Sequence, residues 1–130
     1  MKKEKWIRWK PIEKISEKLY LEELKCNKDG LTLNLKENKN SPILIIHFDG
    51  YFSYRVTDEG DLLKTLYEIE ESEDLGKWTL FVVENSLYIQ WFHKQSFDTH
   101  RDDEIVHYLI ATPNDVIEVL DSDIPTVKWN

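Results

Sequence analysis

Residues 27–35 read NKDGLTLNL, and this stretch decides the fold of the first half of the chain. Its first four residues are of types that favour tight turns. Leu31, Leu33 and Leu35 then alternate with polar residues, which is the period-two pattern of a strand with one buried face. We therefore predict a β-hairpin with strands near residues 20–26 and 31–36.

A short helix and a second hairpin flank this first hairpin. Residues 12–19 are compatible with a helix, and residues 20–26 either continue it or, as we prefer, form the first strand. Downstream, Ile43 to Phe48 is a β-branched, apolar run of strand length. Asp49-Gly50 is a strong short hairpin pattern, so residues 51–56 are expected to return as the next strand of an antiparallel meander.

The second half of the chain alternates helix and strand patterns. Helices are expected over residues 59–72, with acidic residues outward, and over 87–95 after Asn85-Ser86. Strands are expected over 77–83, 105–111 and 116–120, and Pro125 and Trp129 lie in a closing tail. The predicted fold class is α+β, with six or seven mainly antiparallel strands and two or three helices.

Length and composition favour one globular domain over residues 1–130, with residues 1–11 as a basic, tryptophan-containing arm. With 41% hydrophobic residues, the chain is too rich in core-forming side chains for a disordered tail. The single cysteine, Cys26, cannot form an intrachain disulfide, so a reducing cytoplasm is expected. No signal peptide or membrane-spanning stretch is recognised.

Charge is distributed unevenly along the chain. The net charge of −8 disfavours nucleic acid and anionic lipid surfaces as partners. Residues 1–28 hold nine Lys or Arg against five Glu, a net +4, so the rest of the chain carries −12. Residues 58–74 hold eight carboxylates against Lys64 alone, which is the densest charge in the chain.

Catalytic and metal-binding patterns are weak. His100 and His107, with Asp102 between them, could contribute to a metal site, but their spacing matches no ligand motif. A solvated loop and a hydrogen-bonded histidine on the sheet face at His107 are the more common interpretations. Cys26 is more typical of a small apolar filler than of a nucleophile, and no nucleophile elbow or phosphate-binding glycine loop is present. We expect no catalytic residue, no metal and no cofactor.

The five tryptophans divide into two groups. Trp78 and Trp91 are expected in the core. Trp6, Trp9 and Trp129 are the ones that could be exposed anchors.

Two stretches carry a resemblance to a known family. They run from Gly76 to Phe92, including the Glu84-Asn85-Ser86 turn, and from His107 to Leu120. Loosely over residues 42–127, the chain resembles a family of small bacterial proteins, common in Gram-positive bacteria, that look like immunity proteins of polymorphic-toxin loci. The matching positions are structural and carry no active-site residues across. The resemblance implies a protein that binds a toxin domain and covers its site.

The functional prediction is therefore a non-catalytic protein-binding module with a basic protein partner, which an acidic face would attract and orient. The alternative is a small metal-binding or ligand-binding domain or enzyme that uses His100, Asp102 and His107. The predicted partner-binding residues are Trp6 and Trp9 together with the carboxylates Asp58, Glu59, Asp61, Glu68, Glu70, Glu71, Glu73 and Asp74.

Overall fold

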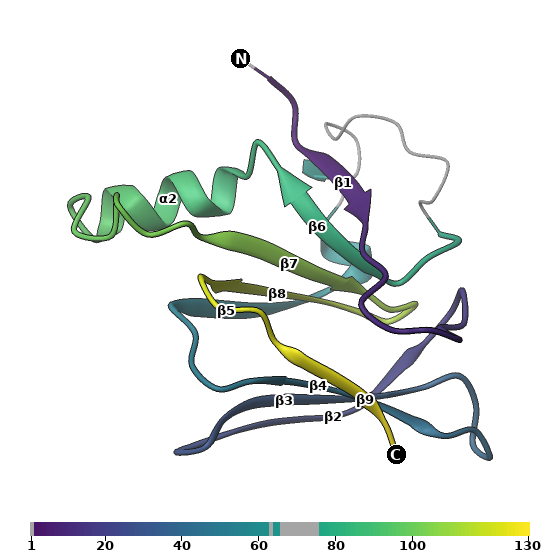
Figure 1. Cartoon of the computed structure of the whole chain (residues 1–130). Coiled ribbons are helices and arrows are strands. Elements are labelled where there is room, and N and C mark those ends of the chain that lie inside the picture. The colour runs from purple at the N-terminus through teal and green to yellow at the C-terminus, as the bar shows by residue number, and fades with distance from the viewer. Residues whose placement is uncertain (1, 63, 66–75) are drawn as a thin grey trace.

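Two antiparallel sheets pack face to face in the computed structural model, which describes residues 2–62, 64–65 and 76–130 (Figure 1). The first sheet has five strands in the order β1-β6-β7-β8-β5. Their bounds are Lys5–Arg8 (β1), Leu80–Glu84 (β6), Val106–Ala111 (β7), Asp115–Asp121 (β8) and Ser53–Asp58 (β5).

The second sheet has four strands in the order β2-β3-β4-β9. Their bounds are Tyr20–Asn27 (β2), Gly30–Lys36 (β3), Ile43–Phe48 (β4) and Thr126–Trp129 (β9). Strands β2 and β3 form the hairpin predicted from NKDGLTLNL, which is confirmed with Asn27 opposite Gly30.

The core lies between the two sheets and follows from the period-two alternation of their strands. In β3 and β4 the inward residues pair directly, so that Leu33 lies opposite Ile46, and both are fully buried. From the five-stranded sheet, Tyr108 and Ile110 face this layer, and the ring of Tyr108 lies 5.4 Å from that of Phe48. The two sheets therefore share one hydrophobic core.

Gly30 is required at the β2–β3 turn. Its φ of 115° lies in a region that side chains with a Cβ rarely adopt. A Cβ built on Gly30 would lie 2.1 Å from the carbonyl oxygen of Phe48, a distance that no real contact reaches. The turn and the close approach of β4 thus both depend on this glycine.

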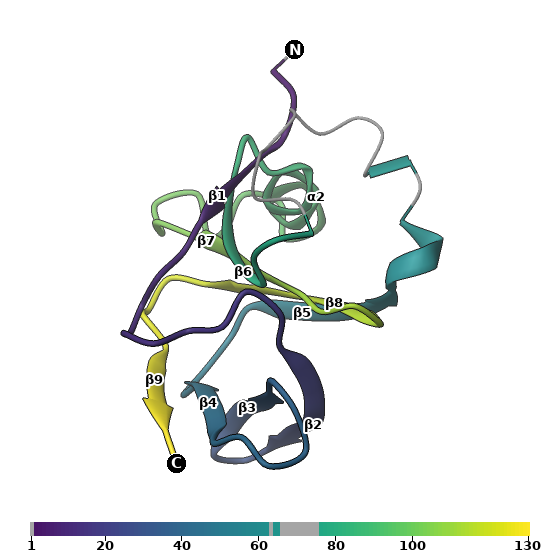
Figure 2. The ribbon, with the colours of Figure 1, turned by 90° about the vertical axis from the view of Figure 1, so that its right-hand side faces the viewer.

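Helix α2 (Leu87–Gln95) lies on the outer face of the five-stranded sheet, away from the other sheet (Figures 1 and 2). Ser86 is its N-cap, and the Ser86 hydroxyl accepts a hydrogen bond from the N–H of Ile89 at 3.0 Å. The predicted helix over 87–95 is confirmed. The prediction that Trp91 is a core residue is wrong, because its side chain is 50% exposed, whereas Trp78 is buried as predicted.

The predicted α+β class is corrected to a mostly β fold. Nine strands replace the expected six or seven, and α2 is the one α-helix whose bounds lie within the described residues. Residues 12–19 form no helix; Lys14 there has a φ of 64°, which a right-handed helix excludes. Of the predicted helix over 59–72, Glu59–Asp61 forms a single 3₁₀ turn (η1), and residues 63 and 66–72 lie outside the described residues.

Strand pairing also differs from the predicted meander. Asp49-Gly50 does not return the chain onto β4, because β4 pairs with β3 on one side and with β9 on the other. The chain instead crosses to the other sheet, where β5 pairs with β8. The expected N-terminal arm contains β1, which pairs with β6 from Lys5 to Arg8, and the expected closing tail contains β9.

Candidate functional site

A buried polar network lies between α2 and the five-stranded sheet. His107 of β7, 1% exposed, places Nε2 2.9 Å from Oε1 of the buried Glu118 of β8. Arg55 of β5, opposite Glu118 in the sheet register, donates to both carboxylate oxygens, from Nε to Oε2 at 2.7 Å and from a terminal nitrogen to Oε1 at 3.1 Å. Side chains of three neighbouring strands thus meet at the buried Glu118 carboxylate, with His107 buried on one side and the half-exposed Arg55 on the other.

Ser86 connects this network to the start of α2. Its Oγ lies 2.7 Å from Nδ1 of His107 and also accepts the N–H of Ile89. Since the Glu118 carboxylate can only accept, Nε2 of His107 donates to it. In a neutral imidazole Nδ1 then accepts, and the Ser86 hydroxyl donates to it. The helix N-terminus, the histidine and the carboxylate form one continuous hydrogen-bonded chain.

The order serine, histidine and glutamate resembles the sequence of groups in a hydrolytic triad. Here the Ser86 hydroxyl is buried, and both its donor and its acceptor capacity are used within the fold. The neighbouring N–H of Leu87, which could otherwise stabilise an oxyanion, donates to the Glu4 carboxylate at 2.8 Å. In this geometry the network fixes the position of α2 and leaves no reactive hydroxyl facing a substrate.

The pKa of Glu118 is set by two opposing effects, burial and hydrogen bonding. Burial by itself raises the pKa of this carboxyl, but the hydrogen bonds from His107 and Arg55 outweigh burial and lower it below its ordinary value. The Arg55 guanidinium also lies 3.9 Å from the ring centroid of Tyr88 on α2. The hydroxyl of Tyr88 is hydrogen-bonded to that of Ser53, so α2 is tied to β5 as well as to β7.

The acidic residues predicted to bind a partner are described in part. Asp58, Glu59 and Asp61 are all exposed where β5 passes into η1, and we call these three residues the acidic corner. Asp58 also fixes the corner locally, because its side chain accepts the N–H of Gly60 at 2.8 Å. Five further predicted residues lie outside the described part of the chain, namely Glu68, Glu70, Glu71, Glu73 and Asp74.

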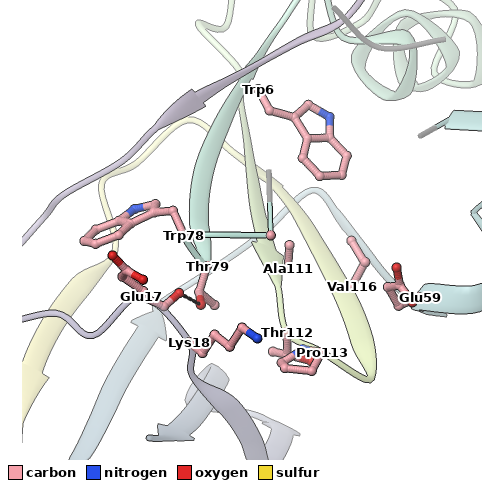
Figure 3. A pocket seen from close by; sticks show the side chains of 11 residues that line it. Trp6, Glu17, Lys18, Glu59, Trp78, Thr79, Ala111, Thr112, Pro113 and Val116 are labelled. Carbon is pink, nitrogen blue, oxygen red and sulfur yellow. Dashed lines mark hydrogen bonds between the residues drawn. The ribbon is translucent and has the colours of Figure 1, made fainter. Parts of the chain in front are cut away.

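A cavity of about 340 Å³ adjoins this corner (Figure 3). Glu59 belongs to its lining, and the aromatic ring of Trp6 and the side chains of Ala111 and Val116 supply an apolar wall. Thr79 also lines the cavity, and its hydroxyl is held by the carbonyl oxygen of Glu17 and the N–H of Leu19. The cavity therefore combines an apolar wall with two carboxylates, Glu17 and Glu59, and one cation, Lys18.

The two tryptophans predicted as exposed anchors lie mainly inside the fold. Trp6 is 3% exposed, and its ring centroid lies 5.6 Å from that of Phe81, which corrects the expectation of an anchor on the surface. Trp9 is half-buried, with its ring 5.1 Å from that of Tyr108, and its carbonyl oxygen accepts the indole N–H of Trp78 at 3.0 Å. Both residues attach the N-terminal segment to the core.

The alternative site at His100, Asp102 and His107 is not assembled. Both ring nitrogens of His107 are engaged by Ser86 and Glu118, as expected for a hydrogen-bonded histidine on a sheet face. His100 lies in the loop after α2, where Nδ1 is 3.0 Å from Asp103 Oδ2. Among the described residues, no group of three or more His, Cys, Asp or Glu is arranged to hold a metal ion.

Sequence reasoning overlooked the partners of His107. Glu118 is the single charged residue in the apolar run from Val116 to Leu120, and a lone carboxylate in a buried strand is itself an indication of a buried ion pair. Arg55, 63 positions away, could not be assigned to it from local spacing.

Comparison with protein family models, with curated proteins and with solved structures found no match to this chain. Within residues 2–62, 64–65 and 76–130, no helix has the length and apolar character needed to span a membrane.

Proposed function

We propose that the protein is a non-catalytic, cytoplasmic protein-binding module that binds a basic protein domain through the acidic corner. In the form that the family resemblance implies, the partner is a toxin domain and the protein is its immunity protein. The observation that carries the proposal is the exposure of Asp58, Glu59 and Asp61 on one turn.

Electrostatics favours such a partner. The three carboxylates lie within four consecutive residues, and outside residues 1–28 the chain carries a net charge of −12. Clustered charge of one sign steers an oppositely charged partner and raises the association rate at low ionic strength. A basic domain would therefore approach this end of the five-stranded sheet preferentially.

The adjoining cavity supports a specific contact as well as steering. A lysine or arginine side chain has an apolar stem and a charged end, which matches an apolar wall whose lining carries two carboxylates, Glu17 and Glu59, against one cation, Lys18. Such a side chain from the partner would place its stem along Ala111 and Val116 and its charge near Glu59.

Cellular protection and binding kinetics test the proposal. The triple variant Asp58→Asn, Glu59→Gln, Asp61→Asn is compared with the charge-matched control Glu13→Gln, Glu22→Gln, Asp29→Asn, whose residues are exposed away from the acidic corner. Each variant is co-expressed with a toxin domain that the unsubstituted protein neutralises, and the association rate of the purified pair is measured at low and high salt.

We expect the corner variant to lose protection and to associate about tenfold more slowly at low salt, as electrostatically steered pairs do. The control variant should keep both the cellular protection and the association rate of the unsubstituted protein. Equal protection and equal rates for the two variants, or the absence of any toxin domain that this protein neutralises, would contradict the proposal.

A further inference from the structure

Helix α2 has an unusual residue at the position that follows its C-cap, Ser96. The N–H of Ser96 donates to the carbonyl of Phe92 at 3.0 Å, that of Phe97 to Lys94 at 3.3 Å, and that of Asp98 to His93 at 2.9 Å. This pattern of hydrogen bonds is the Schellman motif, in which the residue after the C-cap adopts a left-handed conformation. Phe97 occupies that position with a φ of 49°.

Glycine is the residue that this position favours. A left-handed conformation is less favourable for a residue with a Cβ than for glycine, and the next residue, Asp98, is also left-handed with a φ of 57°. The aromatic side chain of Phe97 does not recover that cost by burial, because it is 91% exposed. Neither the local backbone nor the packing of the chain therefore accounts for phenylalanine here.

The turn that presents Phe97 is held in place. The ring of His100 packs 4.8 Å from that of Phe52 and 5.4 Å from that of Phe92, measured between centroids. Its Nδ1 is bound to Asp103, and the N–H of Arg101 donates to the carbonyl of Asp98. Phe97 thus projects from an ordered turn, so little conformational entropy would be lost when it binds.

The loop that follows Phe97 is acidic, and the helix that precedes it carries exposed apolar side chains. Two further apolar side chains of α2, one turn of helix apart, are exposed, namely Leu87 at 47% and Trp91 at 50%. The loop after Phe97 carries four exposed carboxylates against the single cation Arg101, a net −3 over residues 97–104; they are Asp98, Asp102, Asp103 and Glu104. With the exposed Lys94 of the last turn of α2 included, residues 94–104 keep a net charge of −2. An exposed aromatic side chain in an acidic segment fits an apolar pocket with a basic rim.

We propose that Phe97 is a binding anchor that inserts into an apolar pocket on a basic protein domain. The basic character of the partner rests on the proposed function, whereas the anchor itself rests on the geometry of the α2 terminus. A second copy of this chain is the less favourable occupant, because a symmetric contact on this face brings two loops of charge −3 together. Exposed aromatic residues that become buried at an interface centre supply much of its binding energy.

Site-specific photocrosslinking identifies the occupant directly. The photoreactive residue p-benzoylphenylalanine replaces Phe97 in the full chain in its native cells, and the control carries it in place of Ile124, which is 86% exposed and lies before β9. We expect position 97, and not position 124, to crosslink to a basic protein, with the crosslink in an apolar pocket of that protein. A crosslink to a second copy, a crosslink to an acidic protein, or no crosslink above the control overturns the proposal.

Affinity measurements with the purified partner separate this proposal from the proposed function. Phe97→Ala should weaken binding at least tenfold, while Ile124→Ala should leave the affinity unchanged. Loss of binding in Phe97→Ala alone, with the acidic-corner variant unaffected, leaves the anchor standing and rejects the corner. Loss of binding only in the acidic-corner variant rejects the anchor, and so does equal affinity of Phe97→Ala and Ile124→Ala.

Discussion

The Nε2 atom of His107 lies 2.9 Å from Oε1 of Glu118, within a buried layer that joins α2 to the centre of the five-stranded sheet. Arg55 donates a hydrogen bond to the second carboxylate oxygen of Glu118. Ser86 is hydrogen-bonded to the other ring nitrogen of His107. Because the side chains of Ser86, His107, Glu118 and Arg55 all have hydrogen-bond partners within this network, the network holds the helix on the sheet in one position. The stability of the fold should therefore respond to each member of the network.

Glu118→Gln should destabilise the protein by about 2–3 kcal/mol at neutral pH, the usual contribution of hydrogen bonds to charged groups. The pKa of Glu118 is lower in the folded chain than its ordinary value of 4.5, so its contribution is complete above about pH 5. It is lost as the pH falls through the folded-state pKa. Urea unfolding of both proteins between pH 3 and 7 should show the difference in unfolding free energy shrinking at low pH. A difference that stays constant across this range would contradict the assignment.

Ser86→Ala should loosen the start of α2. The substitution removes both the N-cap acceptor for Ile89 and the hydrogen-bond partner of His107, and cap loss alone costs about 1–2 kcal/mol. Hydrogen exchange at the Ile89 amide should accelerate more than exchange in β7 or β8. Ser122→Ala, at an exposed site, is the control and should change stability by less than about 0.5 kcal/mol. Uniform acceleration at all amides would argue against a local role for Ser86.

Gly30→Ala should be strongly destabilising, by about 3 kcal/mol or more, because it combines an unfavourable φ with a steric overlap. The added methyl group would meet the carbonyl oxygen of Phe48 at 2.1 Å. Gly50→Ala is the matched control, since a Cβ on Gly50 meets nothing within 4 Å. Thermal unfolding of both variants checks the prediction, which fails if the two midpoints are similar.

Elements encoded by local sequence could be predicted, and elements defined by distant partners could not. The β2–β3 hairpin has its turn residues and its alternation within one short stretch, and α2 has its cap at Ser86 and its apolar spacing side by side. By contrast, β1 and β9 are four-residue strands with no strong pattern of their own, and they exist through pairing with β6 and β4. This is why the predicted strand number is too small.

The Asp49-Gly50 pair shows how tertiary structure overrides a local preference. This dipeptide favours a tight hairpin with left-handed residues, yet neither residue has a positive φ. The apolar faces of β4 and β5 belong to different sheets, so the chain crosses between layers at this point. Similarly, the exposure of Trp91 and Phe97 could not be read from residue type, because aromatic residues at helical spacing are usually buried.

Phe97→Gly tests the central claim most directly, because stability and binding are expected to change in opposite directions. Glycine relieves the left-handed backbone at the end of α2, which should raise the unfolding free energy by about 1 kcal/mol. The same substitution removes the proposed anchor and should weaken binding of the purified basic partner at least tenfold. The measurement is the unfolding midpoint and the Kd of wild type and variant from the same preparations. A more stable variant with lost affinity is the predicted result, and a variant that binds as tightly as wild type would contradict the account.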